Sequence, residues 1–556
     1  MNNSFAEPLA TFTNRQRELT VLQGVVESLR RGQPRHVALF GTRRIGKTWL
    51  MQRQIEALAA QADPAIRPAY VNLESICTSP EVFVQRYVGL ICFWTLAQGR
   101  GEVDDFLTVT RLLRALPTSP EVVTRTVGRI LNELERRTPD LHFLLDVAWA
   151  FPAHLATDQG FKIVLFLDEF PELATLGNYP QVGDPFKLFR AAFQSGSDLA
   201  YVVAGSAISV MERLIQHHQS PLFLQFELLP LLPFTDQDSR VMAHKLLPQA
   251  TPEVLAAIAQ YSAGYPFYVT ALCHRLERLQ ESGVDSLSAD AVRWAFLLET
   301  LSSDGRIYSY CRYLHDISLQ KARGYGILKA ILQTLAVEEG LTLSEVARRI
   351  HKGASPTGEY LRALLEVDLI VKRERQYYFR DPVLRFWVAY TGRGIELEMS
   401  PRPEELADLL RVVTERFQTA ATELGIAKES QVRELLRRFA GQEVAGIWLG
   451  VAGRVRLPTF TQVEPYRAPD GQVEVDALAE AGAGERWAVE IKWRGRLAGV
   501  KELHKLQAAA AALAARPWFI SKAGFTPEAL ACARQEGIMV SAPADLGQIA
   551  RAVRGD

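Results

Sequence analysis

The stretch Gly41-Thr42-Arg43-Arg44-Ile45-Gly46-Lys47-Thr48 decides how the first part of this 556-residue chain folds. It matches the pattern GxxxxGK[ST], directly after the apolar run HVALF at 36–40 and directly before a helical segment that starts with WLMQ. The glycines permit close backbone approach, and the amides and dipole of the helix N-terminus favour an anion. The sequence therefore predicts a strand–loop–helix unit in which residues 41–48 bind the phosphates of ATP.

Two side chains at the end of this loop have separate expected roles. Lys47 supplies a point charge to the β- and γ-phosphates, and the Thr48 hydroxyl is placed to hold Mg²⁺. ATP and Mg²⁺ are accordingly the expected cofactors.

A second apolar run, IVLFL at 163–167, ends in the acids Asp168 and Glu169. Asp168 is expected to bind the magnesium through water, and Glu169 to polarise an attacking water. In the alternative interpretation the two acids only cap the next turn. Together with the phosphate loop, the acidic pair favours ATP hydrolysis over binding alone.

A third run, AYVVA at 200–204, leads into Gly205-Ser206. Ser206 is a candidate for sensing the γ-phosphate. A serine after a strand is equally often the N-cap of the following helix, so both interpretations stay open.

The composition bounds the class of protein. Lysine plus arginine (63) balances aspartate plus glutamate (63), so any contact with nucleic acid must come from local patches. The five cysteines are scattered without metal-type spacing, which favours reduced thiols. We find no signal-peptide pattern and no apolar run of the roughly 20 residues that span a bilayer. We expect a soluble, cytoplasmic protein without membrane contact.

The length and the changes in pattern predict a multidomain α/β protein. Its first part is expected to be a parallel sheet, with strands at 36–40, 69–73, 163–167 and 200–204. The expected domains are an ATPase core at 1–245 with a helical insertion at about 78–158, a helical lid at 246–320, a winged helix at 321–395, a helical connector at 396–420 and a separate α/β domain at 421–556.

The winged-helix expectation rests on two short helices, at 342–350 and from 355, followed by a strand pair around polar residues 372–376. The second helix could enter a DNA major groove, while the hairpin touches phosphates. Solvated surface charge or a protein-contact module is the alternative. The residues expected near DNA are Lys352, Thr357 and Arg362, with Lys372, Arg373 and Arg375 at the phosphates.

Two strands near the C-terminus, at 473–478 and 487–493, are joined by a turn of small residues. Alternation puts Glu490 and Lys492 on one face, and pairing brings Asp476 beside Glu490. The two acids could hold Mg²⁺ for phosphodiester hydrolysis, with Lys492 orienting or polarising the nucleophile. The alternative is a salt-bridged hairpin in an inactive relative.

Several segments together resemble the archaeal and bacterial AAA-type ATPases related to the STAND class of signalling NTPases. They are FxxRxxEL at 12–19, the pair Arg43-Arg44, LDEF at 167–170, AGS at 204–206 and GYP at 264–266. The resemblance implies that Arg15 helps to enclose the nucleotide and that Gly264 and Pro266 lie near it on the lid. Pro221-Leu222 is followed by FLQ, where relatives often carry an arginine. The resemblance therefore allows a homo-oligomer but does not supply its arginine finger.

The D…ExK arrangement of Asp476, Glu490 and Lys492 resembles the PD-(D/E)xK nuclease superfamily, although the leading proline is absent. The resemblance implies a restriction-endonuclease-like domain. It also implies a further metal ligand on the upstream helix, at Glu429 or alternatively Glu434.

The leading hypothesis is an ATP-hydrolysing, DNA-associated ATPase coupled to a magnesium-dependent nuclease-like domain. One alternative is a nucleotide-dependent switch or regulator whose C-terminal domain binds nucleic acid or protein without cutting. A weaker alternative is a signalling scaffold that does not bind DNA.

Overall fold

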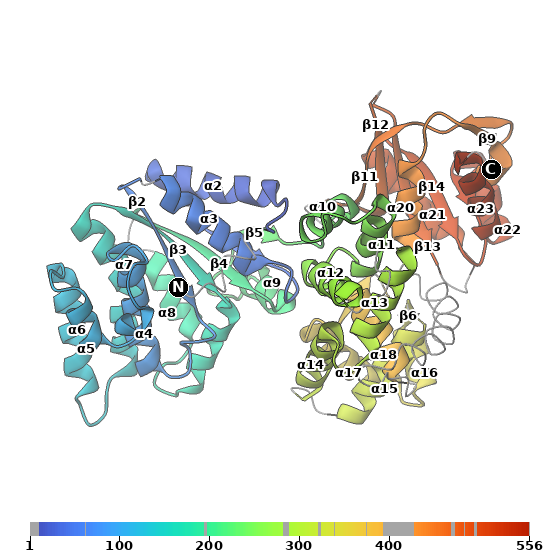
Figure 1. Cartoon of the computed structure of the whole chain (residues 1–556). Helices are drawn as coiled ribbons and strands as arrows, with labels where there is room; N and C mark the ends of the chain where they lie inside the picture. The colour runs from blue at the N-terminus through green and yellow to red at the C-terminus, as the bar shows by residue number, and fades with distance from the viewer. Residues whose placement is uncertain are drawn as a thin grey trace. The chain divides into compact units, whose positions relative to one another are not determined.

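The computed structural model describes residues 11–61, 63–193, 197–281, 288–320, 324–338, 340–373, 375–392, 428–468, 473–482, 484–493 and 497–554. The chain divides into two compact units (Figure 1), one formed by residues 1–232 with Glu366–Asp368 and the other by 233–365 with 369–556. The helical connector expected at 396–420 lies outside the described residues. In the part of the chain described, every helix is too short or too polar to cross a bilayer.

Five parallel strands form the sheet of the first unit, in the order β2-β3-β4-β1-β5. β4 lies between β1, which leads into the phosphate loop, and β3, which ends at Asp168. Every position of β1 and β4 is buried, as expected for a parallel sheet covered on both faces. The strands are Val37–Phe40 (β1), Ile66–Asn72 (β2), Lys162–Asp168 (β3), Leu199–Gly205 (β4) and Glu227–Pro230 (β5).

Helices cover both faces of this sheet. Figure 1 shows α2 and α3 along one face and α4, α7 and α8 on the other. The segment between β2 and β3 contains α4, η2, α5, α6 and α7, which are packed into one apolar cluster with the second face. The helical elements are Gln16–Arg30 (α2), Lys47–Gln61 (α3), Pro80–Thr95 (α4), Val103–Phe106 (η2), Val109–Ala115 (α5), Glu121–Leu134 (α6), Leu141–Gln159 (α7), Phe170–Asn178 (η3), Pro185–Phe193 (α8) and Ile208–Gln216 (α9).

The second unit begins with a group of helices and continues into a small mixed module. Thr342 opens α16 with a capping box, in which its side chain and that of Glu345 each bond the other's backbone amide. β6, β8 and β7 form an antiparallel sheet. The elements are Asp236–Leu246 (α10), Pro252–Ser262 (α11), Pro266–Glu281 (α12), Ala289–Leu301 (α13), Arg306–Gln320 (α14), Tyr325–Val337 (α15), Leu341–Thr342 (β6), Leu343–Arg349 (α16), Ala354–Glu366 (α17), Ile370–Arg373 (β7), Gln376–Phe379 (β8) and Pro382–Thr391 (α18).

The C-terminal part of the second unit is built on a mixed five-stranded sheet, β11-β12-β13-β14-β15. β11, β12 and β13 pair antiparallel, and β13, β14 and β15 pair parallel. Its elements are Lys428–Arg437 (α20), Glu443–Ala445 (β9), Gly446–Leu449 (η4), Arg454–Arg456 (β10), Phe460–Arg467 (β11), Glu474–Ala481 (β12), Arg486–Lys492 (β13), Val500–Ala512 (α21), Arg516–Ser521 (β14), Pro527–Glu536 (α22), Met539–Ser541 (β15) and Pro543–Arg554 (α23).

Alternating side chains of this sheet enter two separate cores. Trp487 and Trp518, both fully buried, pack with α20 and α23 on one face. Ala488 and Phe519, each the next residue in its strand, pack with α21 and α22 on the other face. The sheet is therefore covered on both sides, and polar residues reach its surface at the strand ends.

Candidate functional site

The phosphate loop joins β1 to α3 through an unusual backbone. Arg44 (φ 61°) and Gly46 (φ 104°) have positive φ, and a Cβ at Gly41 would lie 2.6 Å from the Leu231 carbonyl oxygen. Lys47 Nζ donates to the carbonyl oxygens of Gly41 (2.9 Å) and Thr42 (3.1 Å). The loop thus curls around the ammonium group that the sequence assigns to phosphate.

Burial lowers the pKa of Lys47 to about 8, against the opposing charges of Glu169 and Asp168. A bound polyphosphate would add negative charge beside this ammonium group and raise its pKa again.

Arg15 supports the phosphate loop through hydrogen bonds to the backbone. Its side chain is buried, and it donates to the carbonyl oxygens of Leu232 (Nη1, 2.8 Å) and Ile45 (Nη2, 3.2 Å). Ile45 itself is buried, and Arg43 forms an ion pair with Glu74 at 3.6 Å. The guanidinium of Arg15 therefore supports the loop through its backbone.

Asp168 lies at the carboxyl end of β3 and accepts two hydroxyl hydrogen bonds on one oxygen. Thr48 Oγ1 donates to Oδ2 at 2.6 Å, and the Tyr70 hydroxyl donates to the same atom at 3.0 Å. Burial raises the pKa of Asp168, while the Thr48 hydroxyl opposes this shift. Tyr70 is absent from the sequence-based site, although its position near the end of the apolar strand β2 would have been a signal.

Glu169 follows in a left-handed conformation (φ 49°, ψ 49°), and its amide donates to Asp168 Oδ1 at 3.0 Å. Ser206 holds the Glu169 carboxylate from the end of β4. The Ser206 hydroxyl donates to Oε1 at 2.7 Å and its amide donates to Oε2 at 3.3 Å. The N-cap interpretation of Ser206 is wrong, because Ala207 is the N-cap of α9. The serine hydroxyl is instead used on the neighbouring acid.

The two lid residues lie in the second unit. Gly264 has φ 79°, and its carbonyl oxygen accepts from the Phe234 amide at 2.7 Å. A Cβ at Gly264 would lie 2.3 Å from the Phe234 carbonyl oxygen, so a side chain is excluded there. Pro266 is the first residue of α12. The turn is a tight junction between α11 and α12, and its place near nucleotide stays a prediction.

The second group of candidate residues lies where β12 and β13 part. The backbone pairing of the two strands ends at Ala477 and Val489. At the next position the Asp476 side chain, and not a backbone carbonyl, accepts a hydrogen bond from β13. Asp476 Oδ2 accepts from the Ile491 amide at 2.7 Å. Arg433 on α20 donates to the Asp476 carbonyl oxygen at 3.0 Å. The Ile491 bond orients the Asp476 carboxylate, and the Arg433 bond holds the Asp476 backbone.

Glu490 and Lys492 point to the same face of β13 and form a close ion pair. Burial, and after it the charge of Asp476, raises the pKa of Glu490. Burial lowers the pKa of Lys492, but Glu490 and Asp476 outweigh that effect and the pKa is raised. Lys505 on α21 also acts on Glu490 electrostatically. Two carboxylates and the Lys492 ammonium group thus converge at this strand end.

Glu429 and Glu434, the alternative ligands from the helix, both lie on α20, but their side chains are outside the described residues. Arg433 on α20, which no sequence motif indicated, and Lys505 on α21 come from the two helices that flank the strand end.

One expected DNA contact is wrong. Thr357 is fully buried, and its hydroxyl donates to the Gly353 carbonyl oxygen at 2.8 Å, because it lies on the inner face of α17. The other five basic residues are exposed. Lys352 lies just before α17 and Arg362 lies within it. Lys372 and Arg373 lie over the rings of Tyr377 and Tyr378, and Arg375 lies at the hairpin turn.

Residues 457–546 match the model of the Mrr_cat restriction endonuclease family. The matched segment includes Asp476, Glu490 and Lys492 and begins after α20. A search of the curated proteins found no match to the chain.

Among solved structures, the chain is similar to a Walker-type ATPase of Pyrococcus abyssi, with 14% identity, 68% of this chain and 96% of that chain covered, and a TM-score of 0.48. It is also similar to the ORC2 protein of Aeropyrum pernix, with 15% identity, 72% and 96% covered, and a TM-score of 0.42. The Holliday junction branch migration motor RuvB of Thermotoga maritima has 17% identity, 69% and 96% covered, and a TM-score of 0.32.

The fold assignment of the first unit rests on its own geometry. A parallel sheet, a GxxxxGK[ST] loop between β1 and α3, and an acidic pair at the end of β3 define a P-loop ATPase fold. The family match adds a restriction-endonuclease-like domain at the C-terminus. The chain joins these two domains, as the sequence predicted.

Proposed function

We propose that the first unit hydrolyses ATP, and the observation that carries the proposal is the pairing of Ser206 with Glu169. Thr48 of the phosphate loop donates a hydrogen bond to Asp168, and Ser206 at the end of β4 donates one to the adjacent Glu169 carboxylate. Glu169 is therefore a candidate general base for a water that attacks the terminal phosphate. Magnesium, where bound, neutralises phosphate charge, and the oxygen atoms of Thr48 and Asp168 suit it.

In this proposal each side chain has one task. Lys47 and the amides of residues 41–48 bind and orient the phosphates, and Thr48 and Asp168 hold the metal. Glu169 accepts a proton from the attacking water, and Ser206 is a positioning residue for Glu169. Arg15 keeps the loop in shape, while Gly264 and Pro266 are assigned to the lid side of the nucleotide through the resemblance.

Steady-state ATP turnover tests this assignment. Lys47→Ala should lose nucleotide binding, because the charge for the phosphates is removed. Glu169→Gln should keep binding but lower turnover by roughly 10²–10⁴, the usual contribution of general-base catalysis. Lys47→Ala serves as the inactive control. Turnover of Glu169→Gln equal to that of the parent protein would contradict the assignment.

We also propose that the C-terminal domain cleaves DNA with magnesium. Asp476 has one oxygen on the Ile491 amide, and Glu490 lies beside it with its Lys492 partner. These carboxylates offer the oxygen ligands that Mg²⁺ prefers, and Glu429 is the proposed third acid. Lys492 would orient the attacking water or stabilise charge on the phosphate.

Plasmid nicking with magnesium tests the nuclease. Asp476→Asn keeps the acceptor for Ile491 but removes the charge, and Lys492→Met keeps the length of the side chain. Both should abolish nicking, whereas the exposed Lys501→Ala serves as a matched control and should not. Equal cleavage in all four proteins would remove these residues from the mechanism.

The alternative is a switch whose C-terminal domain binds without cutting. It predicts ATP-dependent binding of DNA or protein that survives Glu490→Gln.

We propose DNA as the partner of the exposed winged-helix residues Lys352, Arg362, Lys372, Arg373 and Arg375. DNA should then stimulate ATP turnover, and the stimulation should weaken with salt. We also propose a cytoplasmic location and the five domain boundaries given above. The family resemblance is compatible with a homo-oligomer.

A further inference from the structure

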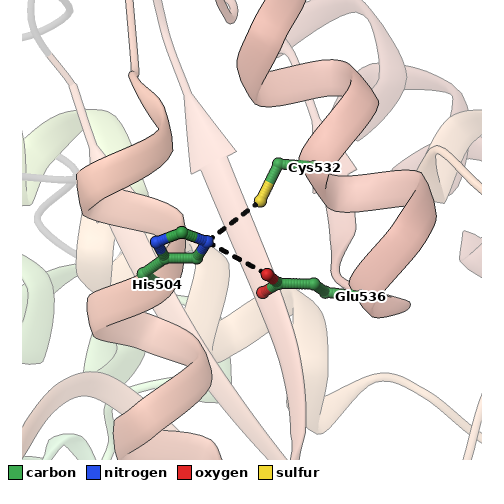
Figure 2. Close-up of side chains that lie close together, drawn as sticks. All are labelled: His504, Cys532 and Glu536. Atoms are coloured by element: carbon green, nitrogen blue, oxygen red, sulfur yellow. Dashed lines mark hydrogen bonds and ion pairs between the residues drawn. The ribbon is translucent and has the colours of Figure 1, made fainter.

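Three side chains of different chemistry meet on the helical surface of the C-terminal domain (Figure 2). His504 comes from α21, and Cys532 and Glu536 come from α22. His504 Nε2 lies 3.0 Å from Glu536 Oε1 and 3.5 Å from Cys532 Sγ. A ligand atom from each residue lies within 4.8 Å of the other two.

The local structure explains why these residues meet. Cys532 and Glu536 are one turn apart on α22 and so share one face of the helix. α21 and α22 pack side by side over Leu503, Ala529 and Ala533 of the apolar core. His504 follows Leu503 at the edge of this core and faces α22, as Figure 2 shows. The backbone positions are therefore set by packing that does not depend on the cluster.

The distances agree with tetrahedral coordination. Zinc bonds of about 2.3 Å to sulfur and about 2.05 Å to nitrogen place the two atoms about 3.6 Å apart at a tetrahedral angle. The Sγ–Nε2 distance is 3.5 Å. Nitrogen and carboxylate oxygen would lie about 3.4 Å apart, so the 3.0 Å contact must open by only about 0.4 Å. Small rotations of the exposed Glu536 side chain suffice.

We propose that His504, Cys532 and Glu536 bind a thiophilic divalent metal ion, with Zn²⁺ as the best fit. Thiolate and imidazole select such ions, whereas magnesium prefers oxygen ligands only. As the sulfur–metal bond forms, the Cys532 thiol releases its proton to solvent. Neutral His504 binds through Nε2 and keeps its proton on Nδ1.

The fourth coordination position faces solvent. The His504 and Glu536 side chains are 55% and 34% exposed, while Cys532 is buried beneath them. Water can therefore complete the tetrahedron. The site joins α21 to α22, and α21 also carries Lys505, whose charge acts on Glu490. Metal binding would add a cross-link between α21 and α22 beside the candidate nuclease site, whether or not that site cuts DNA.

Cobalt(II) titration of the full chain, without oxygen and with a phosphine reductant, tests the proposal. A thiolate-to-cobalt charge-transfer band should grow to one equivalent, and Zn²⁺ but not Mg²⁺ should abolish it. Cys532→Ser should lose the band. The matched control is Cys273→Ser, because Cys273 is buried in α12 of another part of the unit. It should keep the band.

A second variant separates metal binding from folding. His504→Gln changes an exposed position and should weaken cobalt binding at least about tenfold, because removing a direct ligand should cost no less than removing an outer-shell partner. Far-ultraviolet circular dichroism should stay unchanged. A band that persists in Cys532→Ser, or no band in the parent protein, would overturn the proposal. Loss of the band in Cys273→Ser as well would do the same.

Discussion

Substitution of Ser206 by alanine should slow ATP turnover through its neighbour Glu169. The Ser206 hydroxyl donates to the Glu169 carboxylate at 2.7 Å, and a hydrogen bond to a charged group contributes about 1.5–3 kcal/mol. A loss of that size in the transition state corresponds to roughly a 10- to 150-fold lower turnover. The Ser206 amide still donates to Oε2 at 3.3 Å, so we expect the lower end of this range.

A double-mutant cycle distinguishes positioning of Glu169 from direct sensing of the γ-phosphate. ATP turnover is measured for the parent protein, Ser206→Ala, Glu169→Gln and the double variant. If the serine acts through the carboxylate, Ser206→Ala should change turnover little once Glu169 is glutamine. If the fold reductions in turnover from the two single substitutions multiply in the double variant, this reasoning is refuted. Faster turnover in Ser206→Ala would also refute it, because the hydrogen bond would then be inhibitory.

Three other outcomes follow from the two sites. Arg15→Lys should weaken ATP binding by about 1–3 kcal/mol in an equilibrium titration, because an ammonium group lacks the fork that reaches two carbonyls; unchanged affinity would contradict this. Tyr70→Phe should raise the Mg²⁺ concentration for half-maximal turnover, because the Asp168 carboxylate loses a donor; a lower requirement would show that the hydroxyl competes with the metal. DNA cleavage should rise with pH through about 6 as Glu490 loses its proton, and a profile flat from pH 5 to 7 would exclude this ionisation.

Most of the first unit could be predicted from the sequence because its buried strands are continuous apolar runs. β1 to β4 were expected within a few residues. β5 was not, because Glu227–Pro230 is four residues long, ends in proline and has only one buried position. β11 was missed for a similar reason. It is an edge strand with two register shifts and an internal proline, so it lacks a period of two.

In the candidate sites, the sequence predicted the residues of a motif but not the side-chain contacts that form only on folding. Motif spacing located Lys47, Thr48 and Asp168, which the loop and strand geometry bring together. The role of Ser206 depended on which partner its hydroxyl reaches, and no sequence pattern specifies that. His504 and Cys532 are 28 residues apart on separate helices, so their contact exists only once those helices pack.

The left-handed backbone of Glu169 has a consequence for directed evolution. An ordinary L-residue pays about 1–2 kcal/mol for this conformation, whereas asparagine adopts it more readily through local hydrogen bonding. A library selected only for heat resistance should therefore enrich asparagine at position 169. The enriched proteins would melt at higher temperature and would have lost the proposed catalytic base, so a screen for this chain has to retain turnover as a second criterion.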